Sequence, residues 1–231
     1  MSYLNFESII IVTYGRSGST LLQGLLNAVP EILVKGENMN YFYHIFKSHK
    51  HLCNAASQFG GRSSNPTNPW FGINSWNETK ILNHYREIAK DLILGPEISN
   101  PRSPIKCYGF KEIRFFNVPI DELEDYLDFL TKIFPNPCFL FNSRNLDNVV
   151  KSEWWKKKDE SELRKKMINF EDKCKEYAIN KPNCKLVTYE NICLNKGQIE
   201  KIYDLIGTRV DKKIINKVLS TKHSYSTMKM N

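Results

Sequence analysis

The sequence predicts an α/β fold of three layers, in which a mostly parallel central sheet of about five strands is flanked by helices. Short apolar runs alternate along the chain with longer amphipathic stretches, which is the pattern of strands joined by crossover helices. The first apolar run, residues 9–12, leads through a glycine-containing loop directly into a helical stretch. At 231 residues, the chain is long enough for one domain, and we expect it to span residues 1–231.

The strand and helix signals follow one another in a regular order. Pro30 ends the first helical stretch, and Pro119 with the acidic residues after it favours the start of a helix. The expected strands are residues 9–12, 31–35, 106–110, 138–142 and 184–192, the last ending in a turn. The expected helices are residues 21–26, 39–56, 77–94, 119–134, 197–206 and 211–219, with a further helical stripe through 167–177.

Composition narrows the class of protein but not its ligand. The net charge of +8 suits an anionic cofactor, an acidic acceptor, a nucleic acid or a membrane surface equally well. The six cysteines have no paired spacing and are typical of free thiols in a reducing compartment. No apolar run approaches the length of a membrane span, and residues 1–7 do not have a signal-peptide pattern. We therefore expect a soluble, cytoplasmic protein without a membrane span.

The loop after the first strand is the strongest local signal. Two glycines allow a sharp turn that exposes backbone N–H groups, hydroxyl side chains are available to cap the helix that follows, and an arginine adds a positive charge. The loop residues are Gly15, Arg16, Ser17, Gly18, Ser19 and Thr20. This is a P-loop-like anion site, but the lysine of a nucleoside-triphosphate loop is missing. From this loop alone, another kind of phosphate loop or a plain strand-to-helix turn remains open.

A second anchor follows the strand at 138–142. Arg144 stands at the strand end and Ser152 follows two helical turns later. A guanidinium fork and a hydroxyl at this spacing are suited to clamp a phosphate group. A surface arginine and serine placed so by chance is the alternative.

Together, these segments resemble those of sulfotransferases. The opening loop is similar to the R-S-G-[ST]-[ST]-L loop that holds the 5′-phosphosulfate of 3′-phosphoadenosine 5′-phosphosulfate (PAPS), and Arg144 with Ser152 resembles the family's 3′-phosphate motif. Leu146 replaces the usual proline of that motif. Tyr189 and Glu190 look like the Y-E-[DN]-L segment after the last strand. The resemblance implies that PAPS is the cofactor, that 3′-phosphoadenosine 5′-phosphate (PAP) is its product, and that Tyr189 joins the cofactor site.

The resemblance also suggests the catalytic groups. Glu37 follows a short strand at the spacing seen in tyrosylprotein and carbohydrate sulfotransferases, where a glutamate is thought to be the base in some members. The Lys-Thr-His of cytosolic small-molecule sulfotransferases is here Lys111-Glu112-Ile113, so the histidine base is missing. We therefore expect Glu37 as general base, with Arg16 and Lys111 stabilising the transferred group. The alternatives are a capping or surface carboxylate for Glu37, and a strand-end lysine paired with Glu112 for Lys111.

Three further segments bear on acceptor, metal or cofactor contacts. Residues 57–76 are expected to form a long acceptor or lid loop, whose aromatic residues either line an acceptor site or pack on the domain's own surface. His49, His51 and Cys53 do not predict a metal site, because helical residues two apart point in nearly opposite directions. The tail at 222–226 either folds back over the cofactor or frays.

The sequence therefore predicts a PAPS-dependent sulfotransferase that needs no metal and transfers a sulfonate group in line to an acceptor hydroxyl. The expected partner is a carbohydrate or another small-molecule acceptor, and not a nucleic acid; the oligomeric state is left open. The alternatives are a P-loop nucleotide kinase and a nucleotide-binding module without turnover.

Overall fold

The computed structural model describes residues 4–194 and 196–221. Within these residues, five strands form one parallel sheet in the order β2-β3-β1-β4-β5. Their bounds are β1 Ser8–Val12, β2 Ile32–Lys35, β3 Cys107–Glu112, β4 Pro137–Ser143 and β5 Cys184–Thr188. The expected α/β fold with a central parallel sheet of five strands is confirmed.

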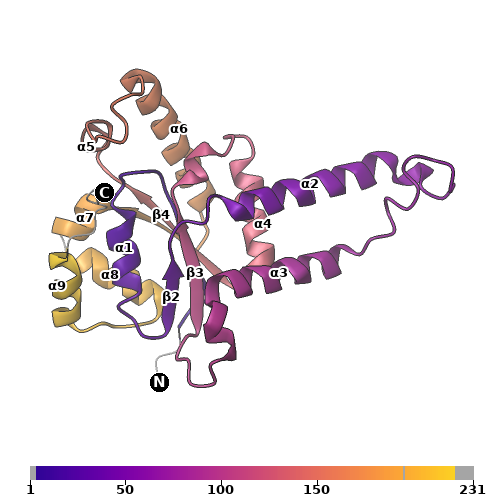
Figure 1. Ribbon diagram of the computed structural model, residues 1–231. Coiled ribbons are helices and arrows are strands. Elements are labelled where there is room, and N and C mark those ends of the chain that lie inside the picture. Colours follow the sequence, from indigo (N-terminus) through magenta and orange to yellow (C-terminus); the bar gives the residue numbers. More distant parts are fainter. Residues whose placement is uncertain (1–3, 195, 222–231) are drawn as a thin grey trace, which may run out of the picture.

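The helices lie on both faces of this sheet (Figure 1). Their bounds are α1 Ser19–Leu26, α2 Tyr41–Phe59, α3 Glu78–Leu94, α4 Leu123–Ile133, α5 Leu146–Val150, α6 Glu160–Ala178, α7 Tyr189–Leu194, α8 Lys196–Ile206 and α9 Lys212–Ser220. Short 3-10 turns cover Gly60–Arg62, Gly95–Ser99 and Arg114–Asn117.

Strand β1 divides the core into two layers. Ile10 and Val12 face a cluster that contains side chains of α2, α3, α4 and α6, whereas Ile9 and Ile11 face a cluster built from α1, α7, α8 and α9. All five residues of β1 are buried, as expected for the central strand of a covered parallel sheet. Its neighbour β3 approaches closely at Gly109, where a Cβ atom would lie 1.7 Å from the Ile9 carbonyl oxygen.

Helices α2 and α3 extend together away from the sheet and form a projection, which we call the helical arm (residues 41–94; Figure 1). The expected helix over 39–56 in fact continues to Phe59 and then into a 3-10 turn. The segment from Ser57 contains no proline until Pro66, so nothing in its backbone stops the helix at residue 56. The expected long loop over 57–76 is therefore shorter, and it forms the outer end of the arm.

Two other boundaries differ from the prediction. The fifth strand ends at Thr188, and Tyr189 begins helix α7, because Glu190 in the first helical turn favours a helix start there. The helix expected over 119–134 begins only at Leu123, after a turn in which the Glu122 N–H donates to the Pro119 carbonyl oxygen at 2.9 Å. Among the described helices, none has both the length and the apolar character needed to cross a membrane.

Candidate active site

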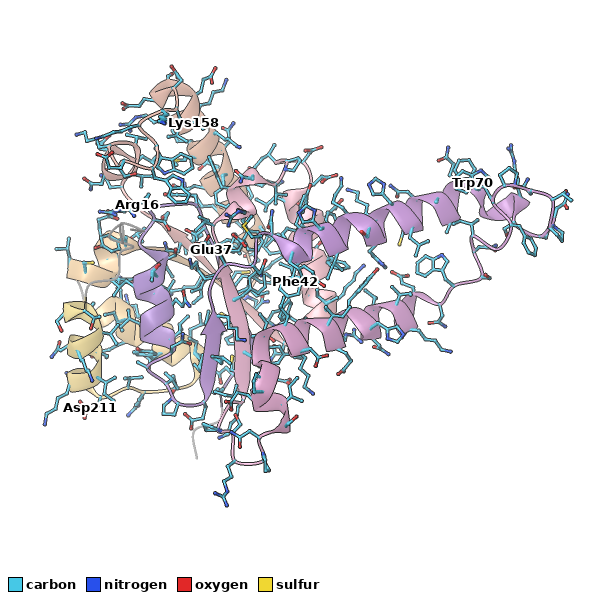
Figure 2. All side chains as sticks on the ribbon, in the orientation of Figure 1. Arg16, Glu37, Phe42, Trp70, Lys158 and Asp211 are labelled. Atoms are coloured by element: carbon cyan, nitrogen blue, oxygen red, sulfur yellow. The ribbon has the colours of Figure 1, made fainter. Side chains whose placement is uncertain are left out.

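The candidate site lies at the edge of the sheet where the parallel strands end. Glu37 follows β2, Lys111 is the last residue but one of β3, Arg16 follows β1, Arg144 follows β4 and Tyr189 follows β5. In open α/β sheets, ligands bind at this carboxyl edge. Here the five side chains line one cavity of about 740 Å³. The other lining residues are Gly15, Gly18, Ser19, Thr20, Leu21, Ile113, Trp154, Cys193, Leu219 and Thr221. Figure 2 shows Arg16 and Glu37 at this edge.

The opening loop presents backbone rather than side-chain caps to the cavity. Gly18 is the N-cap of α1 with φ of 80°, and no side chain caps the helix, which corrects the expectation that the loop hydroxyls do so. Ser17 is buried below the loop, where its hydroxyl lies 2.7 Å from the Thr13 hydroxyl. No side chain caps the first turn of α1, and the Leu21 N–H donates to the Gly18 carbonyl oxygen at 3.0 Å. The N–H groups of Ser19 and Thr20, which precede it, are suited to bind an anion.

Arg16 lies at the outer side of this loop. Its φ of 70° is unusual for a residue with a Cβ atom, and its side chain is exposed. Such backbone strain is concentrated at functional sites. Its carbonyl oxygen accepts a hydrogen bond from Arg144 Nη1 at 3.2 Å, so the loop after β1 and the end of β4 are in direct contact.

Two tryptophans hold the loop from the α5–α6 side. Trp155 Nε1 donates to the Gly15 carbonyl oxygen at 3.1 Å. A Cβ atom at Gly15 would lie 3.3 Å from atoms of both Trp154 and Trp155. Trp154 is exposed and lines the cavity, and therefore offers an aromatic face next to the loop.

Arg144 is held in place by the Tyr189 ring and the Tyr14 hydroxyl. Its guanidinium lies over the Tyr189 ring, 4.4 Å from the centroid, and Tyr189 in turn packs so closely on Gly18 that a Cβ there would lie 2.1 Å from the ring. Its backbone N–H donates to the Tyr14 hydroxyl at 3.0 Å. The Tyr14 hydroxyl donates to Glu171 Oε1 at 2.6 Å. Burial, followed by this hydrogen bond, raises the pKa of Tyr14, and burial raises the pKa of Glu171.

The two groups of the expected 3′-phosphate motif carry unpaired polar atoms. Arg144 Nε and Ser152 Oγ are both buried, and neither has a hydrogen-bond partner among the described residues. Buried polar atoms in folded proteins are nearly always paired, so two orphaned donors on one motif fit a missing anionic ligand. Arg144 lines the cavity, whereas Ser152 does not belong to its lining.

Glu37 forms ion pairs with two cations. Its Oε1 lies 2.7 Å from Lys111 Nζ, and its Oε2 lies 3.0 Å from Arg114 Nη1. Lys111 is almost fully buried, whereas a third of the Glu37 side chain is exposed. The alternative pairing of Lys111 with Glu112 is not what the structure has. Each carboxylate oxygen has two lone pairs, so these contacts leave acceptor capacity on the exposed side of Glu37.

Glu112 braces the segment that carries Glu37. Its side chain is fully buried, and its Oε2 accepts hydrogen bonds from the backbone N–H groups of Asn38 and Asn40, both at 2.9 Å. Its Oε1 accepts from the Arg114 N–H at 3.0 Å and lies 3.3 Å from Arg114 Nη1. A buried carboxylate with this many donors holds the turn after β2 in register with the end of β3.

The structure thus brings together most of the predicted site residues and adds others. Ser17 and Ser152 are the predicted residues outside the cavity lining. Sequence reasoning missed the roles of Tyr14, Glu112, Arg114, Trp154 and Trp155. The Gly-Phe-Lys-Glu-Ile-Arg run at 109–114 did contain a signal for Glu112 and Arg114, since it places charged residues of both signs at the end of a buried strand.

The aromatic residues of 57–76 lie elsewhere. Phe59 and Trp70 stack on each other with ring centroids 3.9 Å apart, and Trp70 lies at the outer end of the helical arm, far from Arg16 and Glu37 in Figure 2. The acceptor or lid role of this segment stays a prediction. The tail at 222–226 lies outside the described residues.

The chain has a P-loop-like α/β fold, and sulfotransferase domains of known structure share this fold. It is similar to the sulfotransferase domain of the olefin synthase from Synechococcus PCC 7002, with a TM-score of 0.56 and 14% identity over 96% of this chain and 80% of that one. It is also similar to the sulfotransferase domain from the curacin biosynthetic pathway, with a TM-score of 0.54 and 12% identity over 98% and 82% of the two chains. No protein-family model and no curated protein sequence matches the chain.

Proposed function

We propose that this protein is a sulfotransferase that uses PAPS to sulfate an acceptor hydroxyl. The observation that carries the proposal is the shared cavity: the anion-binding loop after β1, Arg144 after β4 and Glu37 after β2 all line one space of about 740 Å³. This volume lies within the roughly 300–1,000 Å³ of typical small-molecule sites. A ligand with phosphate groups at two ends can therefore meet both arginine-bearing corners at once.

The residues present fit the cofactor. The uncapped N–H groups of Ser19 and Thr20 at the start of α1, together with the Arg16 guanidinium, would hold the 5′-phosphosulfate end. Arg144 and Ser152 would hold the 3′-phosphate, which would satisfy the two orphaned buried atoms of that motif. Tyr189 would keep the Arg144 guanidinium in place by stacking. When bound, PAPS supplies an activated sulfonate group.

Glu37 would act as the general base. A base needs hydrogen-bond reach to the acceptor hydroxyl and a free lone pair. The exposed side of the Glu37 carboxylate keeps a lone pair, and Glu37 lines the cavity in which an acceptor would bind. Lys111 has three donors and uses one of them on Glu37, so it can also stabilise negative charge on the transferred group. The acceptor oxygen would bond to the sulfonate sulfur as the bond from that sulfur to the 5′-phosphate oxygen breaks, so that PAP leaves and the acceptor proton goes to Glu37.

For the acceptor, we propose a carbohydrate hydroxyl. Trp154 supports this choice because its exposed ring lines the same cavity as Glu37, and sugar rings pack on aromatic faces. The aromatic face near the base thus comes from the segment after Ser152 rather than from residues 57–76.

Thermal unfolding with added nucleotides tests the cofactor. We expect PAP to raise the melting temperature at concentrations where ATP with Mg²⁺ has little effect. The reverse result would favour the nucleotide kinase. Transfer of labelled sulfonate from PAPS to a panel of carbohydrate, lipid, alcohol and peptide acceptors then tests the activity. Binding of PAP without transfer to any acceptor class would indicate a module without turnover.

A further inference from the structure

Three side chains of different chemistry converge inside the helical arm. His49 and Cys53 lie four residues apart on one face of α2, and Glu78 is the first residue of α3. The imidazole, thiol and carboxylate ligand atoms all lie within 4.8 Å of one another. His49 and Cys53 are about one helical turn apart and therefore share a face of the helix, whereas His49 and His51 are two residues apart and do not.

The separations are long for hydrogen bonds. His49 Nε2 lies 3.6 Å from Cys53 Sγ and 3.4 Å from Glu78 Oε1. A good N–H···O bond measures about 2.7–3.2 Å, so the contact with Glu78 is a weak one. The Nε2 atom of His49 carries at most one hydrogen, so it cannot donate a hydrogen bond to both Cys53 and Glu78.

The same separations fit ligands that share one metal ion. Zinc binds sulfur at about 2.3 Å and nitrogen or oxygen at about 2.0 Å, and tetrahedral angles then place sulfur and nitrogen about 3.6 Å apart and nitrogen and oxygen about 3.3 Å apart. Both observed distances from His49 Nε2 lie close to these values. The third pair, Cys53 and Glu78, is within reach because an exposed glutamate side chain can adjust.

The surroundings hold the imidazole in place. His49 is 5% exposed, and its ring packs against Trp76, Tyr85 and Phe129 with centroid distances of 5.4–6.1 Å. Its Nδ1 is buried and has no hydrogen-bond partner among the described residues, so aromatic packing rather than a hydrogen bond orients the ring. Glu78 is about half exposed, which leaves an entry path and a fourth position for water.

We propose that His49, Cys53 and Glu78 form a binding site for a divalent transition metal, with zinc as the best match to this mixed set of nitrogen, sulfur and oxygen ligands. The ion replaces the thiol proton of Cys53, which is released to solvent. It cross-links the start of α3 to the middle of α2. His49 lies eight residues into α2, roughly 12 Å along the helix from Tyr41, and none of the three ligands lines the cavity of the candidate active site, so the two sites are separate.

Metal titration of the full chain, first stripped with a chelator, tests this site. We expect one zinc ion per chain, and a melting temperature about 5 to 10 °C higher at a zinc concentration 100 times the dissociation constant. Cobalt in place of zinc should give a thiolate-to-cobalt absorption band. Glu78→Gln changes an exposed side chain and should weaken binding about tenfold or more, and Cys53→Ser should remove the band.

The matched control is His51→Gln, since His51 lies on the same helix but is exposed and outside the cluster. This variant should bind zinc like the unmodified protein. Absence of stoichiometric zinc binding would overturn the proposal. So would a cobalt band that persists with equal affinity in Cys53→Ser, because another cysteine would then be the ligand.

Discussion

Replacement of Arg144 by alanine isolates the recognition of the 3′-phosphate. Its guanidinium sits over Tyr189 and donates to the Arg16 carbonyl oxygen, while its Nε atom is buried and has no hydrogen-bond partner within residues 4–194 and 196–221. If Nε and the remaining donors bind the 3′-phosphate, alanine removes charge-assisted hydrogen bonds and leaves the rest of the cavity in place. The loss of binding affinity should then depend on whether the ligand carries a 3′-phosphate.

The expected size follows from the number of contacts. Hydrogen bonds to a charged group contribute about 1.5–3 kcal/mol, and each 1.4 kcal/mol changes a dissociation constant about tenfold. Arg144→Ala should therefore weaken PAP binding roughly 10- to 100-fold. Adenosine 5′-phosphate lacks the 3′-phosphate, so its binding should weaken by about threefold or less, as expected for a screened charge that does not contact the ligand.

Calorimetric titration of both ligands against both proteins measures this difference directly. Arg144→Lys keeps the charge but not the planar fork, and should fall between the two proteins. Arg164→Ala is the control for charge, because Arg164 pairs with Asp147 and Glu160 on the surface and does not line the cavity. Loss of the stacking on Tyr189 costs about 0.5–1 kcal/mol of stability, so each variant must be shown to be folded. Equal losses for PAP and adenosine 5′-phosphate would refute the assignment of Arg144.

Three further predictions concern other parts of the molecule. Glu37→Gln should lower labelled sulfonate transfer by about 10²- to 10⁴-fold and leave PAP affinity nearly unchanged, and unchanged turnover would exclude Glu37 as base. Gly18→Ala should lower the free energy of unfolding, measured with denaturant, by about 1–3 kcal/mol, because φ is 80° and the new Cβ would lie 2.1 Å from the Tyr189 ring. An unaltered denaturation midpoint would contradict this close packing. The hydrogen bond from Lys47 lowers the pKa of Glu122 below its usual 4.5, so the pair stabilises the fold above that pH and ceases to do so as acid protonates the carboxylate. Glu122→Gln should therefore flatten the fall in melting temperature below pH 4.5, and equal slopes would count against the pair.

The sequence was sufficient to predict that the candidate residues that lie at strand ends share one edge of the sheet. Arg16, Glu37, Lys111 and Arg144 each come at or just after an apolar run, and a parallel sheet brings all such positions to one edge. Their shared edge could therefore be predicted before the order of the strands was known.

The partners of these residues could not be predicted, because they depend on that order. Glu37 meets Lys111 and Arg114 because β2 lies beside β3, with Lys35 in register with Phe110. A single sequence contains no signal for this neighbour, and the local alternative, Lys111 with Glu112, was the simpler interpretation. The same limit applies to His49 and Glu78, which are joined only when α3 returns alongside α2.

Strand order also fixes the sequence in which the candidate groups lie across the sheet. Across the sheet, the groups run from Glu37 after β2 and Lys111 on β3, through the loop after β1, to Arg144 after β4. Neighbouring strands lie about 4.8 Å apart, so the ends of β2 and β4 are separated by roughly 14 Å. A cofactor whose 3′-phosphate is held at the β4 end and whose reactive group lies at the β1 loop would thus point that group toward Glu37. The proposed base stands on the side of the loop opposite the phosphate clamp, so an acceptor bound beside Glu37 would approach the reactive group from the side away from the 3′-phosphate.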